Sequence, residues 1–115
     1  MTPEVIKDAK IRYILDNYLD KILQEFAPSE IWLFGSRVHG LPDEYSDVDM
    51  ILVSERFRGV PFFDRRNLFR ELIGVDWDRS AETVDVLCYT AEEFEQKRSA
   101  PTIVREAVEK GVRVA

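Results

Sequence analysis

Two aspartates separated by one residue begin an otherwise apolar segment that runs from Asp47 to Val53. Side chains alternate across a strand, so Asp47 and Asp49 are expected on one face, with Val48 on the other. Two carboxylates within about 7 Å of each other repel, and burying them unpaired would cost several kcal/mol. A divalent cation between them removes this conflict, and carboxylate oxygens suit Mg²⁺ or Mn²⁺. The pair therefore predicts a metal site.

A third carboxylate, Asp85, lies near the start of another apolar segment, residues 83–89. If that segment is a strand beside the first, with Asp85 at the same height, three carboxylates surround a two-metal site. One ion would activate a hydroxyl nucleophile and the other would hold a triphosphate. Asp47, Asp49 and Asp85 are therefore the candidate metal ligands and catalytic residues.

A polar turn, Gly35-Ser36-Arg37, follows the apolar run at residues 31–34. Gly35 lets the backbone approach a phosphate closely, and the following N–H groups and the Ser36 hydroxyl can donate to its oxygens. Arg37 can add a charge-assisted contact. A phosphate-binding turn beside metal-binding acids is what phosphoryl or nucleotidyl transfer requires, so Gly35, Ser36 and Arg37 are the candidate nucleotide-binding residues.

Simpler explanations exist for each of these features. The two aspartates alone can mark a solvated loop edge, and Arg37 can pair with Asp43 or Glu44 in a surface contact that contributes under about 1 kcal/mol. Several arginines lie between the second strand and the following helix, where a solvated helical face is the simplest interpretation and a basic rim for a triphosphate or a partner is the alternative. They are Arg56, Arg58, Arg65, Arg66 and Arg70.

The spacing of apolar residues and the capping signals predict four helices. Thr90 is the expected N-cap of the third, with Glu93 at the capping-box position, and Gly111 is the expected end of the fourth. A short helical turn and a loop are expected over residues 38–46. The predicted helices run from Thr2–Pro3 to before Pro28, over residues 61–73, from Thr90 onward, and over residues 100–110.

Short apolar segments predict the strands, at residues 31–34, 47–53 and 83–89, with a possible edge strand at residues 112–114. The continuous apolar run at residues 31–34 favours a strand that is buried on both faces. The order of helices and strands predicts an α+β fold of two layers, in which a small mixed sheet of three or four strands packs against helices. The pairing order of the strands cannot be read from the sequence.

Composition limits the classes of protein to which the chain can belong. Its 115 residues, 45% of them hydrophobic, predict one domain spanning residues 1–115 with a core of its own. The formal net charge of −6 leaves no broad basic surface, so direct nucleic-acid binding is not expected. The single cysteine, Cys88, lies in an apolar run, and no segment is long enough to cross a bilayer. These features predict a soluble cytoplasmic protein.

The residues from Leu33 to Arg37, the ten-residue gap and the segment Asp47-Val48-Asp49-Met50 resemble the Gly-Ser…Asp-x-Asp signature of the nucleotidyltransferase superfamily related to DNA polymerase beta. The segment around Asp85 resembles the third catalytic carboxylate of that superfamily. At this length the chain is similar to a minimal nucleotidyltransferase (MNT domain), commonly encoded beside a HEPN-domain toxin as its antitoxin. That branch often has a second basic residue in the turn, where this chain has His39.

This resemblance implies a nucleotidyltransferase fold, Mg²⁺ and a nucleoside triphosphate, usually ATP. It also implies transfer of AMP to a tyrosine hydroxyl of a HEPN toxin. Asp47 and Asp49 would bind both metal ions, and Asp85 would act as general base or complete the site of the ion that activates the acceptor. Homo-oligomers or hetero-oligomers are compatible with this reading.

Two other functions are compatible with the same residues. The protein could mask a toxin as a binding module, with its acidic residues contributing little. It could instead modify a small-molecule hydroxyl, in which case the short chain would need a dimer or a second subunit to supply the acceptor pocket.

Overall fold

Four strands form one mixed sheet at the centre of the computed structural model, which describes residues 8–35, 38, 48–73 and 84–115. Strand β1 (Glu30–Phe34) pairs antiparallel with β2 (Val48–Val53) and with β4 (Val112–Arg113), whereas β2 pairs parallel with β3 (Val84–Tyr89). The order across the sheet is β3-β2-β1-β4. The predicted α+β class and the small mixed sheet are thus confirmed, and the expected edge strand is present.

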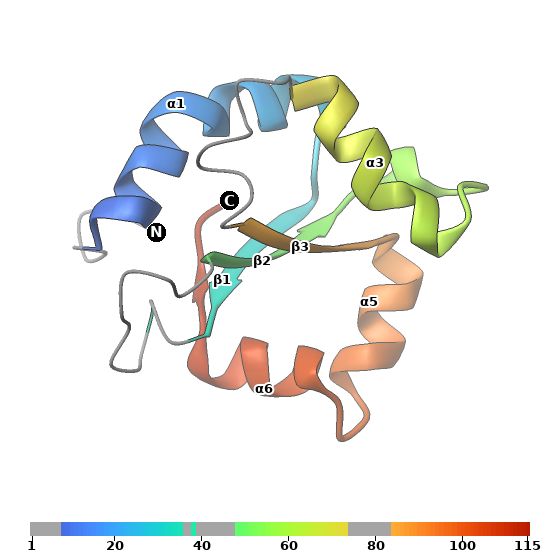
Figure 1. Cartoon of the computed structure of the whole chain (residues 1–115). Helices are drawn as coiled ribbons and strands as arrows, with labels where there is room; N and C mark the ends of the chain where they lie inside the picture. The colour runs from blue at the N-terminus through green and yellow to red at the C-terminus, as the bar shows by residue number, and fades with distance from the viewer. Residues whose placement is uncertain (1–7, 36–37, 39–47, 74–83) are drawn as a thin grey trace.

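Helices cover both faces of the sheet (Figure 1). On one face lie α1 (Ala9–Phe26) and α3 (Phe62–Ile73), and on the other lie α5 (Ala91–Arg98) and α6 (Ile103–Lys110). A 3₁₀ turn, η2 (Glu55–Phe57), connects β2 to α3. The predicted two-layer arrangement is corrected in this respect, because β1, β2 and β3 carry apolar side chains on both faces and each face requires a helical cover.

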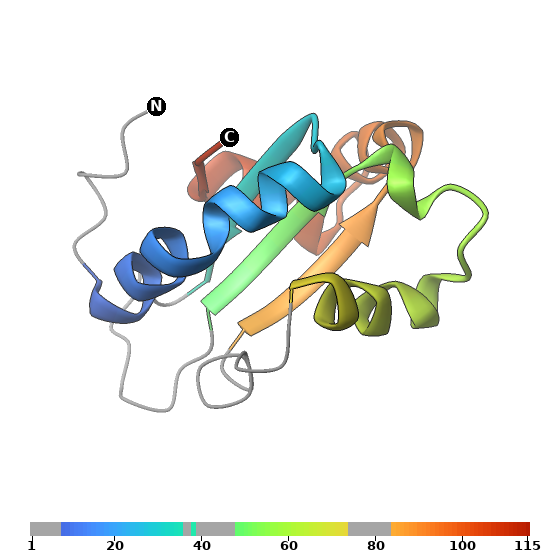
Figure 2. The ribbon, with the colours of Figure 1, turned by 90° about the horizontal axis from the view of Figure 1, so that it is seen from above.

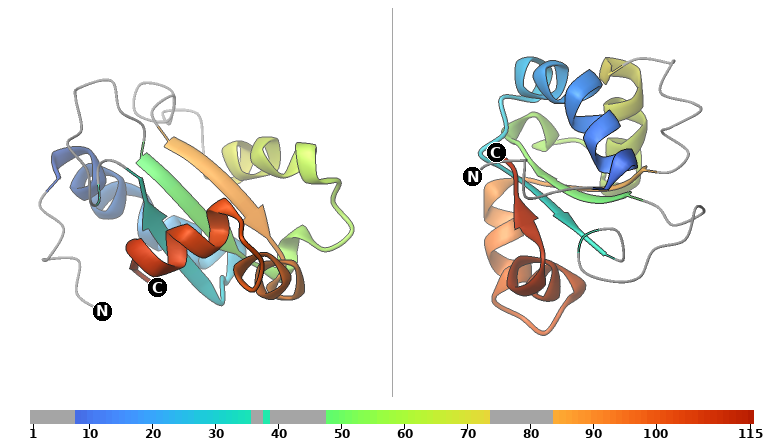
Figure 3. Two further views of the ribbon diagram at one scale, coloured as in Figure 1. Left: turned by 90° about the horizontal axis from the view of Figure 1, so that it is seen from below. Right: turned by 90° about the vertical axis from the view of Figure 1, so that its left-hand side faces the viewer.

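Alternate residues of β2 face the two helical layers. Met50 and Leu52 belong to the core beneath α1 and α3, and Ile51 and Val53 belong to the core against α5 and α6. Figure 2 shows α1 and α3 lying over one face of the strands, and Figure 3 shows α5 and α6 on the opposite face. Asp49 alternates with Met50, so it lies on the face that α5 and α6 cover.

Helix α1 begins later than the sequence predicts. Asp8 is its N-cap, with extended backbone and a carboxylate that accepts from the amides of Lys10 (3.0 Å) and Ile11 (3.1 Å). A carboxylate at the N-cap satisfies the first free backbone N–H groups of a helix, so Asp8 marks the start of α1, and the start expected from Thr2 is wrong. Residues 1–7 lie outside the described residues. The predicted end is confirmed, since the helix stops at Phe26.

The capping signals near the C-terminus are confirmed. The Thr90 hydroxyl and the Glu93 carboxylate accept reciprocally from each other's backbone amides, at 3.3 and 2.8 Å. Gly111 ends α6, and its amide donates to the Ala107 carbonyl at 2.7 Å. A Cβ at residue 111 would lie 2.5 Å from the Leu33 carbonyl oxygen, so only glycine lets α6 end this close to β1.

The other boundaries follow the sequence closely. Pro61 precedes α3 as expected, and Thr102 caps α6, which therefore begins at Ile103 and not near residue 100. Within the described residues, no helix is both long enough and apolar enough to cross a membrane.

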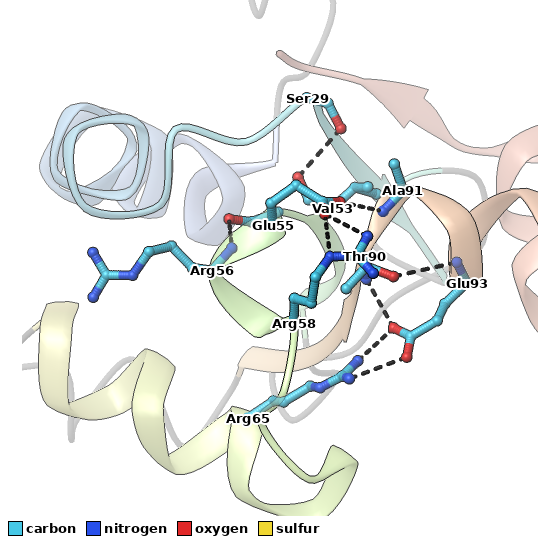
Figure 4. Close-up of polar contacts among 10 residues, drawn as sticks. Ser29, Val53, Glu55, Arg56, Arg58, Arg65, Thr90, Ala91 and Glu93 are labelled. Atoms are coloured by element: carbon cyan, nitrogen blue, oxygen red, sulfur yellow. Dashed lines mark hydrogen bonds and ion pairs between the residues drawn. The ribbon is translucent and has the colours of Figure 1, made fainter.

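Arg65 of α3 is buried, with only 6% of its surface exposed. Its Nε donates to the Val60 carbonyl (2.9 Å) and its Nη1 to the Cys88 carbonyl (3.1 Å). Two further bonds reach the two carboxylate oxygens of Glu93, at 2.6 and 3.0 Å (Figure 4). The expectation of a solvated face is therefore wrong for Arg65, which ties α3 to the edge of β3 and to the first turn of α5.

The ion pair sets the acidity of Glu93. The bonds from Arg65, with a further bond from the Thr90 amide, lower the pKa of Glu93 from 4.5 to about 2. The side chain of Glu93 is 40% exposed, so water screens part of this effect. The folded protein thus holds this carboxylate in its charged form over nearly the whole acid range.

We expect Glu93→Gln to lower the free energy of unfolding at pH 7 by about 1–2 kcal/mol, because it leaves a buried guanidinium without its counter-charge. Since the pKa is depressed in the folded state, the contribution of Glu93 is fully present above about pH 4.5 and is lost as the pH falls toward 2. Urea titrations at pH 7, 4.5 and 3 measure this contribution to the free energy of unfolding.

The wild type will lose more stability on acidification than Glu93→Gln, whereas the exposed neighbour change Glu92→Gln will follow the wild type. Parallel pH profiles for Glu93→Gln and the wild type would contradict this assignment.

Candidate functional site

Three residues that lie far apart in the sequence form one row across the sheet. Phe34 of β1 is in register with Asp49 of β2, and Asp49 is in register with Asp85 of β3. Neighbouring strands lie about 4.8 Å apart, so the two carboxylates start from adjacent backbone positions on the face that α5 and α6 cover. Asp85 therefore lies opposite Asp49 on the neighbouring strand, as a site shared by the two carboxylates requires.

The remaining predicted residues cannot be placed in this row. Asp47, Ser36 and Arg37 lie outside the described residues, as does most of the predicted turn and loop over residues 38–46. Among the residues that the structure describes, no three His, Cys, Asp or Glu side chains gather as a metal-binding group. The donors that are placed, two carboxylates in register, are hard oxygen ligands of the kind that Mg²⁺ and Mn²⁺ prefer. The metal-binding and catalytic roles stay predictions.

Gly35 lies directly against Asp49. Its φ of +88° is in the left-handed region, which favours glycine. A Cβ at this position would lie 2.1 Å from Oδ2 of Asp49, so a side chain would collide with the carboxylate. The Gly35 carbonyl accepts from the Val38 amide at 3.0 Å. Two constraints thus select glycine here, the backbone angle and the space that Asp49 occupies.

Asp85 forms an ion pair with Arg66 of α3. Both side chains are about half exposed, at 47% and 48%, so the pair lies at the surface and contributes little to stability. Its consequence is electrostatic, because the guanidinium supplies the positive charge that a carboxylate beside Asp49 needs. Sequence reasoning placed Arg66 among solvated arginines and did not connect it with Asp85, which is 19 residues away.

A hollow of about 190 Å³ opens beside Asp49. Helix α6 forms its second wall, which no local motif in the sequence indicates. In the structure Ile103, an apolar residue at the first position of α6, lies on this wall and is 59% exposed. The lining residues are Phe34 and Asp49 from the sheet, Gly35 directly after β1, and Ile103, Glu106 and Ala107 from the helix.

We expect Gly35→Ala to lower the free energy of unfolding by about 2 kcal/mol or more, through backbone strain and the collision with the Asp49 carboxylate. In an Asp49→Ala background the collision is absent, so the loss will fall to about 1 kcal/mol from strain alone. A double-mutant cycle by chemical denaturation measures the difference. Equal losses in both backgrounds would mean that the carboxylate moves away without cost.

Comparison with known proteins gives a family and a fold. The model of the nucleotidyltransferase domain family matches residues 15–114. A search of curated proteins found no match. Among solved structures, a protein from Sulfolobus solfataricus assigned as a nucleotidyltransferase is 20% identical, with a TM-score of 0.58 over 90% of this chain and 80% of that chain.

A second structure assigned as a nucleotidyltransferase is 23% identical, with a TM-score of 0.52 over 93% of this chain and 100% of that chain. BolA1 from Arabidopsis thaliana superposes less closely, with a TM-score of 0.49 and 19% identity over 68% of this chain and 92% of that chain. The first two similarities support the fold, and the family match, which spans the site row from Phe34 to Asp85, supports nucleotidyl transfer. The chain belongs to the nucleotidyltransferase domain family.

Proposed function

We propose that the protein is an Mg²⁺-dependent nucleotidyltransferase that transfers AMP from ATP to a tyrosine hydroxyl of a HEPN-domain toxin and thereby acts as its antitoxin. One observation carries the catalytic part of the proposal, namely the register of Asp49 with Asp85 beside the close contact of Asp49 with Gly35. A phosphate chain that approaches the Gly35 backbone would have its reacting end at the two carboxylates. The identity of the partner, a HEPN-domain toxin, is inferred from the resemblance to the MNT branch.

The candidate residues would divide the tasks of this reaction among them. Asp47 and Asp49 would hold the ions, which supply charge neutralisation and polarise the reacting oxygens. Gly35, Ser36 and Arg37 would bind the β- and γ-phosphates through backbone amides, a hydroxyl and a guanidinium. The acceptor oxygen forms a bond to the α-phosphorus, the bond from that phosphorus to the bridging oxygen breaks, and pyrophosphate leaves. Asp85 would complete the site of the ion that activates the acceptor hydroxyl or, as general base, accept the proton of that hydroxyl.

Arg66 would compete with a metal ion for Asp85, because both cations seek the same carboxylate. We expect Arg66→Gln to tighten Mn²⁺ binding by up to about fivefold, which corresponds to the roughly 1 kcal/mol of an exposed ion pair. Titration of free Mn²⁺ by electron paramagnetic resonance measures this without any reaction. Arg66→Lys keeps the charge and will bind Mn²⁺ as the wild type does, and Arg70→Gln controls for net charge on the same helix. Weaker Mn²⁺ binding by Arg66→Gln would contradict the competition.

The activity is tested with labelled ATP, Mg²⁺ and the protein encoded by the neighbouring gene. We expect Asp49→Asn, which keeps the side-chain size beside Gly35, and Asp85→Asn to lower AMP transfer about 100-fold or more. Asp64→Asn, an exposed change on α3, will leave transfer unchanged. Mass spectrometry of the partner locates the modified residue.

Full labelling by Asp47→Ala/Asp49→Ala would overturn the catalytic assignment. A double variant that no longer labels the partner, yet still binds it and restores growth, would instead show that the protein acts as a binding module. Label on an added small-molecule hydroxyl and not on the partner would show the third function.

A further inference from the structure

We propose that the hollow between the end of β1 and α6 binds the nucleoside part of the donor nucleotide. This inference rests on the proposed function and adds a subsite to it. Three of the lining residues, Phe34, Gly35 and Asp49, belong to the row and turn that would hold the reacting phosphates. The nucleoside is joined directly to the α-phosphate, so its site must adjoin Asp49, as this hollow does.

The size and the walls of the hollow fit a ring system. Its volume of about 190 Å³ is below the roughly 300–1,000 Å³ of sites that enclose a whole small molecule, so one base or sugar fills it. Phe34 and Ala107, which are both buried, and Ile103, which is 59% exposed, give it apolar lining. An apolar ring against Ile103 would remove that side chain from water, which favours binding.

Charge decides which part of the nucleotide faces α6. Glu106 lines the hollow and offers only acceptor oxygens, which repel phosphate and attract ribose hydroxyls or a base amino group. Its ion pair with Lys110 is 3.5 Å long and exposed on both sides, so a ligand donor can share the carboxylate at little cost. The phosphates therefore point toward Gly35 and the nucleoside toward Glu106.

Two other hollows of the described chain do not meet these conditions. One, of about 270 Å³, lies between α3 and β3, and another, of about 400 Å³, lies between α3, β3, α5 and the start of α6. Neither is lined by Gly35 or Asp49. Ile103 also lines the larger of the two, so a change at Ile103 needs a control that alters that hollow alone. Gln96 of α5, which lines only the larger hollow of these, provides it.

The test compares two ligands, α,β-methylene ATP and inorganic tripolyphosphate, each bound with Mg²⁺ and measured by isothermal titration calorimetry. We expect Ile103→Ser and Glu106→Ala each to weaken binding of the ATP analogue about fivefold, from lost apolar contact and a lost hydrogen bond. Binding of tripolyphosphate will stay within twofold for Ile103→Ser and will stay equal or tighten for Glu106→Ala, which removes a negative charge.

Controls separate this subsite from general effects. Glu109→Ala makes the same charge change on the same helix, and Gln96→Ala alters the larger hollow, so both will bind the two ligands as the wild type does. Equal weakening of both ligands by Ile103→Ser and Glu106→Ala, or no weakening of either, would overturn the inference. A wild type that binds tripolyphosphate as tightly as the ATP analogue would overturn the nucleoside subsite and leave the phosphate site intact. A wild type that binds neither would overturn the proposed function as well.

Discussion

The contact between the Gly35 backbone and the Asp49 carboxylate is the constraint around which the candidate site is arranged. A side chain at residue 35 would overlap Oδ2 of Asp49, and the φ of +88° would strain any other residue. The contact also depends on register, because Phe34 pairs with Asp49 only while β1 and β2 keep their present alignment. A shift of one residue would turn Asp49 into the core beneath α1 and α3, where its charge would lie among apolar side chains.

Two adjacent arginines of α3 connect this site to the rest of the fold in different ways. Successive residues of a helix point about 100° apart, so Arg65 turns inward and Arg66 turns toward Asp85. Arg65 is buried against Glu93 and the β3 carbonyl of Cys88, and thereby fixes α3 along the edge of β3. Arg66 is half exposed and can exchange its carboxylate for another partner. One helix thus provides both a fixed support and a replaceable counter-charge.

Much of the fold could be predicted because its signals are local. The strands at residues 31–34 and 83–89 follow from apolar runs, and the capping box of Thr90 and Glu93 follows from a spacing of three residues. The start of α1 was predicted wrongly because Thr2 and Asp8 are both good caps, and local pattern does not rank them. The two-layer arrangement was wrong because a short apolar run does not indicate whether helices pack on one face of the sheet or on both.

The sequence by itself determined the candidate chemistry, because the Gly-Ser-Arg turn and the spacing of the acidic residues are local features. This motif resembles a family to which the family match assigns the chain. The tertiary structure decided which residues become neighbours: Asp49 is in register with Asp85, Asp85 pairs with Arg66, and Glu106 of α6 lines the hollow beside Asp49. These partners come from different elements and lie up to 57 positions apart along the chain. Hydrophobic periodicity has a period of two or 3.6 residues, so it places each residue on a face but carries no information about which distant face it will meet.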